Sequence, residues 1–111
     1  MDIRARDTDR ELLLEFSGEM DHHGARNALK EVEIAIDAAL PRSLILDFAG
    51  VTFMDSSGIG VLLNRYKQLK AGNTGFYGAC PQVMRVLKVA GILGLMHQYE
   101  SKEEAIYSRE V

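Results

Sequence analysis

Residues 53–61, Phe-Met-Asp-Ser-Ser-Gly-Ile-Gly-Val, join an apolar run to the start of a helix. Upstream of them, Leu44-Ile45-Leu46 is apolar on both faces, which is typical of a central strand that helices cover. Downstream, apolar residues recur at helical spacing, so a helix is expected from about Ser57 to Ala71. This switch from a strand pattern to a helix pattern predicts an α/β unit with two serines at its turn.

Strand and helix patterns alternate on both sides of this unit. An antiparallel hairpin is expected at the N-terminus, where apolar residues at period two end at Gly18. Helical spacing follows over about 24–40, with Leu40 on the apolar face, and Pro41 stops that helix. A short strand at 75–79, a helix from Pro81 to Gly91, an edge strand at 97–99 and a final helix capped by Ser101 complete the pattern.

This order predicts an α/β fold in a single domain over residues 1–111, with a mixed, mostly parallel sheet of four to five strands covered by about four helices. Right-handed crossovers make the strands at 11–17, 43–48 and 75–79 parallel, so their C-terminal ends share one rim. Open α/β sheets usually place their ligand sites at such ends. We therefore expect one surface from the three loops that follow them, Asp21-His22-His23, Asp55-Ser56-Ser57 and Cys80-Pro81.

Composition narrows the possible functions. The chain has 111 residues, is 47% hydrophobic and carries a net charge of −3 without a basic cluster, which argues against nucleic acid as a partner. No apolar run approaches the ~18 residues of a membrane span, and the N-terminus lacks a signal-peptide pattern, so we expect no membrane association and a cytoplasmic location. Cys80 is the only cysteine, so no internal disulfide can form. A monomer is expected, because no apolar surface stripe is left over for self-association.

Two explanations remain open for Ser56 and Ser57. Serine is among the best helix N-caps, so one of them could simply start the helix. Two serines exceed what one cap requires, however, and Gly58 and Gly60 each cost roughly 1 kcal/mol relative to alanine inside a helix. Such a cost is tolerated where a ligand or a neighbour must approach the backbone closely. Because a helix N-terminus also favours an anion, we interpret the site as a phosphorylation switch, with the Asp55 carboxylate as a repulsive neighbour.

Other chemistries fit the sequence poorly. A nucleophilic serine hydrolase would need a Gly-x-Ser-x-Gly elbow, and position 54 is methionine. Asp21-His22-His23 suggests a metal site, but adjacent histidines cannot easily face one ion, and no further cluster supplies more ligands. We interpret Asp21 instead as a helix cap that accepts N–H bonds near positions 23–24. Gly58-Ile59-Gly60 lacks the third glycine of a dinucleotide fingerprint. We thus expect no catalytic residue, metal or cofactor.

Residues 53–61, followed by Arg65-Tyr66-Lys67, closely resemble the anti-anti-sigma factor family, whose fold is called the STAS domain. Residues 18–23, Gly-Glu-Met-Asp-His-His, resemble the first loop of its sporulation branch, the antagonists of the sigma-F anti-sigma factor. The resemblance covers nearly the whole chain in the order of its elements and becomes loose after about Gly72. A STAS fold is therefore expected.

This resemblance implies a function and a set of partners. Family members bind an anti-sigma factor that is also a serine kinase, with its bound ATP or ADP, and so release a sigma factor. The kinase phosphorylates the first serine after the aspartate, which is Ser56 here, and a PP2C-type phosphatase restores activity. The implied partner-binding residues are Asp21, His22, Asp55, Ser56, Ser57 and Gly58. An alternative is a STAS module of a sensory complex or a transporter-associated regulator, which would bind a small ligand or a scaffold.

Overall fold

The computed structural model describes residues 1–8, 11–66 and 73–107. Its elements follow in the order β1 (Asp2–Thr8), β2 (Glu11–Met20), α1 (His22–Ala39), β3 (Ser43–Met54), α2 (Ser56–Tyr66), β4 (Thr74–Tyr77), α3 (Pro81–Val89), the 3-10 turn η1 (Ile92–Gly94), β5 (His97–Gln98) and α4 (Lys102–Tyr107). The strands form one five-stranded sheet in sequence order. β1 pairs with β2 antiparallel, and the remaining neighbours are parallel. The predicted mixed, mostly parallel sheet is confirmed.

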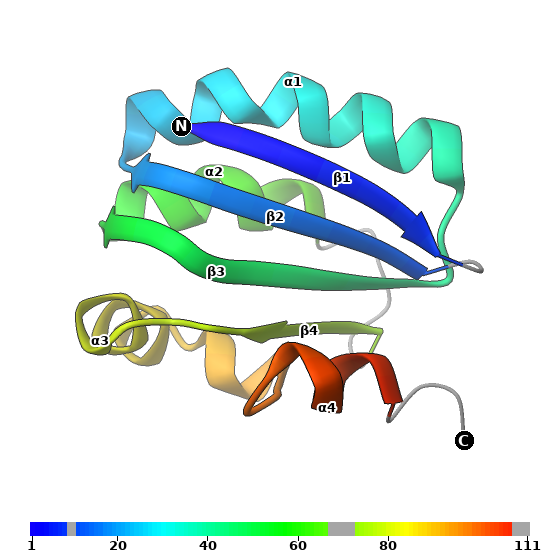
Figure 1. Cartoon of the computed structure of the whole chain (residues 1–111). Coiled ribbons are helices and arrows are strands. Elements are labelled where there is room, and N and C mark those ends of the chain that lie inside the picture. The colour runs from blue at the N-terminus through cyan, green and yellow to red at the C-terminus, as the bar shows by residue number, and fades with distance from the viewer. Residues whose placement is uncertain (9–10, 67–72, 108–111) are drawn as a thin grey trace.

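The main core lies between the sheet and the helices α1, α2 and α3. Phe16, Phe48 and Phe76 come from three adjacent strands, and neighbouring ring centroids are 5.9 Å apart. Buried side chains of the helices pack in the same cluster, among them Val32 of α1 and Val83 of α3. Burial of such apolar side chains contributes about 1.5–3 kcal/mol each, which makes this layer the main source of stability. Figure 1 shows α2 behind the sheet.

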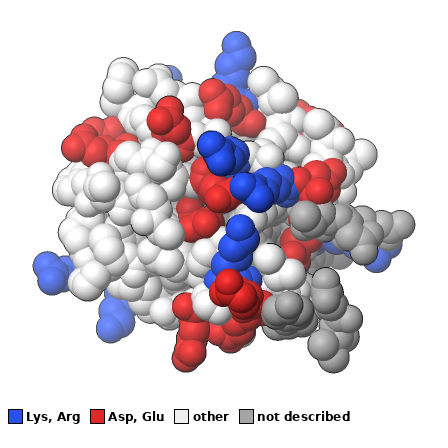
Figure 2. Space-filling view, viewed as in Figure 1, with Lys and Arg blue, Asp and Glu red and all other residues white. Residues whose placement is uncertain are grey.

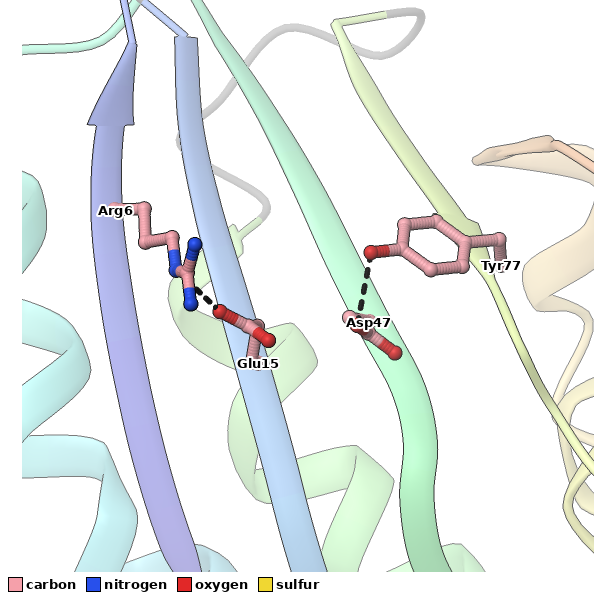
Figure 3. Close-up of polar contacts among 4 residues, drawn as sticks. All are labelled: Arg6, Glu15, Asp47 and Tyr77. Carbon is pink, nitrogen blue, oxygen red and sulfur yellow. Dashed lines mark hydrogen bonds and ion pairs between the residues drawn. The ribbon is translucent and has the colours of Figure 1, made fainter. Parts of the chain in front are cut away.

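The opposite face of the sheet is covered only in part. Helix α4 lies over β4 in front of the sheet (Figure 1), where Ala105 packs in a small second cluster with Ile45 and Tyr77. Further toward β1 the face is polar: Arg6 pairs with Glu15 at 2.8 Å, and the Tyr77 hydroxyl donates a 2.8 Å hydrogen bond to Asp47 (Figure 3). Figure 2 shows basic and acidic side chains side by side at the centre of this face. Burial of Tyr77, and then its hydrogen bond to Asp47, raise the pKa of this phenol.

Strands β2 and β3 are longer than the sequence pattern predicted. β2 runs to Met20 rather than Gly18, and β3 runs to Met54 rather than Phe48. The pairing register shifts twice, between Glu15 and Ser17 and again between Gly18 and Glu19. Gly18 has a φ of +104°, a conformation that only glycine adopts without strain. The strict alternation that sequence reasoning relies on fails at these bulges, so the continuation of β3 resembled a loop.

Other element boundaries differ by a few residues. α1 begins at His22, and its C-cap Leu40 has a φ of +46° and is 78% exposed, so the prediction that Leu40 lies on the buried face is wrong. β4 covers Thr74–Tyr77, because Gly78 turns the chain with a φ of +81°. The predicted end of the second helix at Ala71 lies outside the described residues. In the described part of the chain, no helix is both long and apolar enough to cross a membrane.

Candidate functional site

The C-terminal ends of β2, β3 and β4 lead into one continuous rim of the molecule. The Asp55 N–H donates a 3.3 Å hydrogen bond to the Met20 carbonyl, which joins the loop after β3 to the end of β2. On the other side, both main-chain groups of Met54 bond to the side chain of Gln82 in α3: the Met54 N–H donates at 3.1 Å, and the Gln82 amide donates to the Met54 carbonyl at 2.7 Å. Figure 1 shows β2 and β3 ending where α1 and α2 begin. The predicted convergence of the three loops is confirmed.

Asp55 starts the second helix. Its Oδ1 accepts a 2.7 Å hydrogen bond from the Gly58 N–H, and its carbonyl accepts from the Ile59 N–H at 3.2 Å. Both are the bonds of an N-cap residue, so the explanation that a serine caps this helix is wrong. Ser56 and Ser57 instead occupy the first turn of α2, and both are exposed. The hydroxyl of Ser56 is therefore accessible and is not needed to begin the helix.

The loop after β2 repeats this arrangement. Asp21 caps α1, and its Oδ1 accepts a 2.7 Å hydrogen bond from the Gly24 N–H, which confirms the predicted cap. His22 and His23 follow in the first turn and are exposed. The His23 ring lies 3.2 Å from the Asn27 amide nitrogen, along the same helix. Two Asp-x-x-Gly caps thus lie beside each other on the rim, and they present His22 and Ser56 as the first residues of adjacent helices.

The two glycines of the serine loop have different roles. A Cβ atom at Gly58 would overlap the carbonyl oxygen of Met20 and crowd the carbonyl carbon of Asp21, so the close approach of the two loops requires glycine here. At Gly60 an added Cβ would meet no described atom within 4 Å. The expectation that a ligand or a neighbour approaches the backbone closely is confirmed for Gly58, whereas no described neighbour approaches Gly60, where approach by a ligand stays a prediction.

The rim carries charge of one sign at the strand ends. Glu19 is exposed near the end of β2, and Asp21 and Asp55, which directly follow β2 and β3, are half-buried. The N–H groups at the start of α2 favour a negative group nearby, whereas the Asp55 carboxylate repels one. Gln82 was not predicted as part of the rim. The sequence shows only a polar residue in the first turn of the helix that follows Cys80-Pro81. It does not show that this side chain bonds to the main chain of Met54.

The chain belongs to the STAS domain family, which matches residues 2–105. An anti-sigma F factor antagonist from Paenibacillus polymyxa is 33% identical over 102 residues, which are 90% of this chain and 87% of that protein. The structure of the anti-sigma factor antagonist SpoIIAA in its unphosphorylated form is similar with a TM-score of 0.79 at 29% identity, over 99% of this chain and 98% of that one. The Bacillus cell fate determinant SpoIIAA in its phosphorylated form gives a TM-score of 0.72 at 28% identity, over 97% and 99% of the two chains. The predicted family and fold are confirmed.

Proposed function

We propose that this protein is an anti-sigma factor antagonist controlled by phosphorylation of Ser56. In its unphosphorylated form it binds an anti-sigma factor serine kinase, and the sigma factor is released. The observation that carries the proposal is the position of Ser56, which is exposed at the first residue of α2 on the rim shared with Asp21. The Paenibacillus polymyxa relative and SpoIIAA, which resemble the chain over nearly its whole length, are anti-sigma factor antagonists, and SpoIIAA has also been solved in a phosphorylated form.

In this proposal the chain itself performs no chemistry. The kinase holds ATP and transfers its γ-phosphoryl group to Ser56 Oγ, which loses its proton, and ADP is left on the kinase. A PP2C-type phosphatase hydrolyses the phosphoester and restores the hydroxyl. Asp21, His22 and Ser57 surround the acceptor as partner contacts. Gly58, which was expected to contact the partner, is buried and instead lets the two loops approach each other, and Asp55 fixes the position of Ser56. The protein works in the cytoplasm as a single-domain monomer without a cofactor.

The effect on binding follows from charge. Phosphorylation adds about −1.5 to −2 charges beside the Asp55 carboxylate. Burying such a group in an interface that fits a neutral hydroxyl is expected to cost several kcal/mol, and each 1.4 kcal/mol weakens binding about tenfold. In the free protein the phosphoserine is solvated and lies at the positive end of α2. The modified protein therefore stays folded while its complex dissociates.

Phosphate mapping tests the proposal directly. The purified protein is incubated with its cognate anti-sigma factor kinase and ATP, and the modified residue is identified by mass spectrometry. We expect one phosphate on Ser56 in the wild-type protein and in Ser57→Ala, which is the matched control, and none in Ser56→Ala. Modification of Ser57 or of a residue elsewhere in the chain would contradict the assignment of the switch to Ser56.

A further inference from the structure

Phe53 is the one exposed residue among the four phenylalanines. Phe16, Phe48 and Phe76 are at most 2% exposed and lie in the main core, whereas Phe53 is 42% exposed next to the rim. The neighbouring residue Met54 is completely buried. A partly exposed ring forgoes part of the roughly 1.5–3 kcal/mol that full burial of a phenylalanine contributes. Other large apolar side chains such as Leu40 and Val89 are also exposed, but Phe53 is the aromatic one among those of the described residues.

The second bulge of the sheet turns this ring outward. In the pairing of β2 with β3, Gly18 lies opposite Val51 and Glu19 lies opposite Phe53, so Thr52 is the extra residue. The Thr52 hydroxyl donates to the Gly18 carbonyl at 3.3 Å, and Thr52 is exposed. Regular alternation from the buried Val51 would point Phe53 into the core and Met54 out of it. Because of the bulge, Met54 points into the core and Phe53 points out of it. Bulges beside functional sites commonly redirect a side chain in this way.

The surroundings of the ring indicate what covers it. Glu19 is its cross-strand neighbour, and Asp55 follows two residues later in the chain. Asp21 lies on the adjacent loop, which is bonded to the loop of Asp55 through Met20. Glu19 is an exposed carboxylate opposite the ring, and the half-buried carboxylates of Asp21 and Asp55 cap the two helices that start at the same rim. An exposed aromatic ring on an acidic rim is complementary to an apolar pocket with basic side chains at its edge.

We propose that Phe53 is the aromatic anchor of the complex with the anti-sigma factor, and that it enters an apolar pocket edged by lysine or arginine on that partner. This inference rests on the proposed function, because the same partner must reach Ser56. Aromatic residues near the centre of an interface carry a large part of the binding free energy. Phe53 precedes the phosphoacceptor by three residues, so docking of the ring would also bring Ser56 to the kinase.

The test compares two truncations of exposed apolar side chains. Phe53→Ala is matched by Ile34→Ala, whose side chain is 60% exposed in α1, well beyond the first turns that form the rim. Affinity for the purified cognate anti-sigma factor kinase with ADP is measured by calorimetry, and folding by circular dichroism and urea unfolding. We expect Phe53→Ala to bind at least about tenfold more weakly and Ile34→Ala to bind like the wild type, with both variants folded. Phe53→Leu, which retains an apolar side chain, should bind with intermediate affinity.

Two possible results distinguish failure of the Phe53 anchor from failure of the proposed function. If the wild type binds the kinase and Phe53→Ala binds equally well, the anchor is wrong and the proposed function stands. If the wild type does not bind, both are wrong. For the basic edge of the pocket, Glu19→Gln should weaken binding at low salt and have little effect at high salt, because screening removes the attraction. Equal affinity of Glu19→Gln and wild type at low salt would show that the pocket has no basic edge.

Discussion

At the scale of single residues, the site divides two tasks between neighbours. Asp55 accepts the Gly58 N–H at 2.7 Å and so holds the start of α2. Ser56 lies one residue further along and is exposed. If Ser56 also capped the helix, its phosphorylation would alter the hydrogen bonds that begin α2. Because the cap is an aspartate, modification of Ser56 changes the charge of the surface and leaves the bonds of the cap in place.

Substitutions at position 56 test whether charge or size controls binding. Ser56→Asp should unfold at the same urea concentration as the wild type, since the side chain is exposed, but should bind the anti-sigma factor at least about tenfold more weakly. The asparagine of Ser56→Asn has nearly the same size as the aspartate of Ser56→Asp but no charge, so this variant should retain most of the affinity. Calorimetric titration of both variants provides the comparison. An equal loss for Asn and Asp would mean that the partner rejects the larger side chain and not its charge.

At the scale of elements, the start of α2 shows which local features are required by packing. Gly58 is buried against the end of β2, where a side chain has no room. Gly60 lies inside the same helix with no described atom near its absent Cβ. The helix therefore carries one glycine that the fold requires and one that lowers its stability.

Alanine at each glycine should act in opposite directions. Gly60→Ala should raise the free energy of unfolding by about 0.5–1 kcal/mol, because alanine is the better helix former. Gly58→Ala should lower it by at least about 2 kcal/mol, because the methyl group would force β2 and α2 apart. Urea unfolding followed by circular dichroism measures both changes. A destabilised Gly60→Ala would show that a neighbour outside the described residues packs against this position.

The same elements show why part of the fold and site could be predicted from the sequence. Helix α1 and the parallel order of β2, β3 and β4 follow from local periodicity and from the fixed hand of crossovers. Helix α4 follows from its serine cap, and the Ser101 hydroxyl does accept the Glu104 N–H. The ends of β2 and β3 could not be predicted, because two bulges put Phe48, Val51 and Met54 into the core at a spacing of three. The cap by Asp55 required a choice between adjacent polar residues that only the hydrogen bond to Gly58 decides.

At the scale of the whole molecule, the two faces of the sheet differ in what stabilises them. One face is sealed by three helices over aromatic and aliphatic side chains. The other combines a small cluster beneath α4 with polar pairs, of which the hydrogen bond from Tyr77 to Asp47 reaches across from β4 to β3. Tyr77 belongs to this cluster, and Figure 3 shows its bond to Asp47 on the neighbouring strand, so the bond links the cluster to the polar part of the face.

The raised pKa of Tyr77 predicts how stability depends on pH. In the unfolded chain a tyrosine loses its proton near pH 10, whereas burial and Asp47 keep Tyr77 protonated to higher pH in the folded protein. The contribution of this group is therefore complete below about pH 10 and is lost as the pH rises toward the folded value. Between pH 9 and 11 the wild type should lose more stability than Tyr77→Phe, by up to about 1.4 kcal/mol per pH unit above 10. Parallel slopes in urea unfolding would contradict this account.

The aspartate cap at position 55 has a practical consequence for engineering the partner binding of this protein. Since the backbone of α2 begins without help from the next side chain, position 56 can be occupied by any of the common amino acids that tolerate a first helical turn. A complete substitution library at that position would thus rank side chains mainly by what the partner accepts, because charge in the first helical turn changes stability by only about 0.3–1 kcal/mol. Variants locked permanently on, or permanently off, could be selected from it.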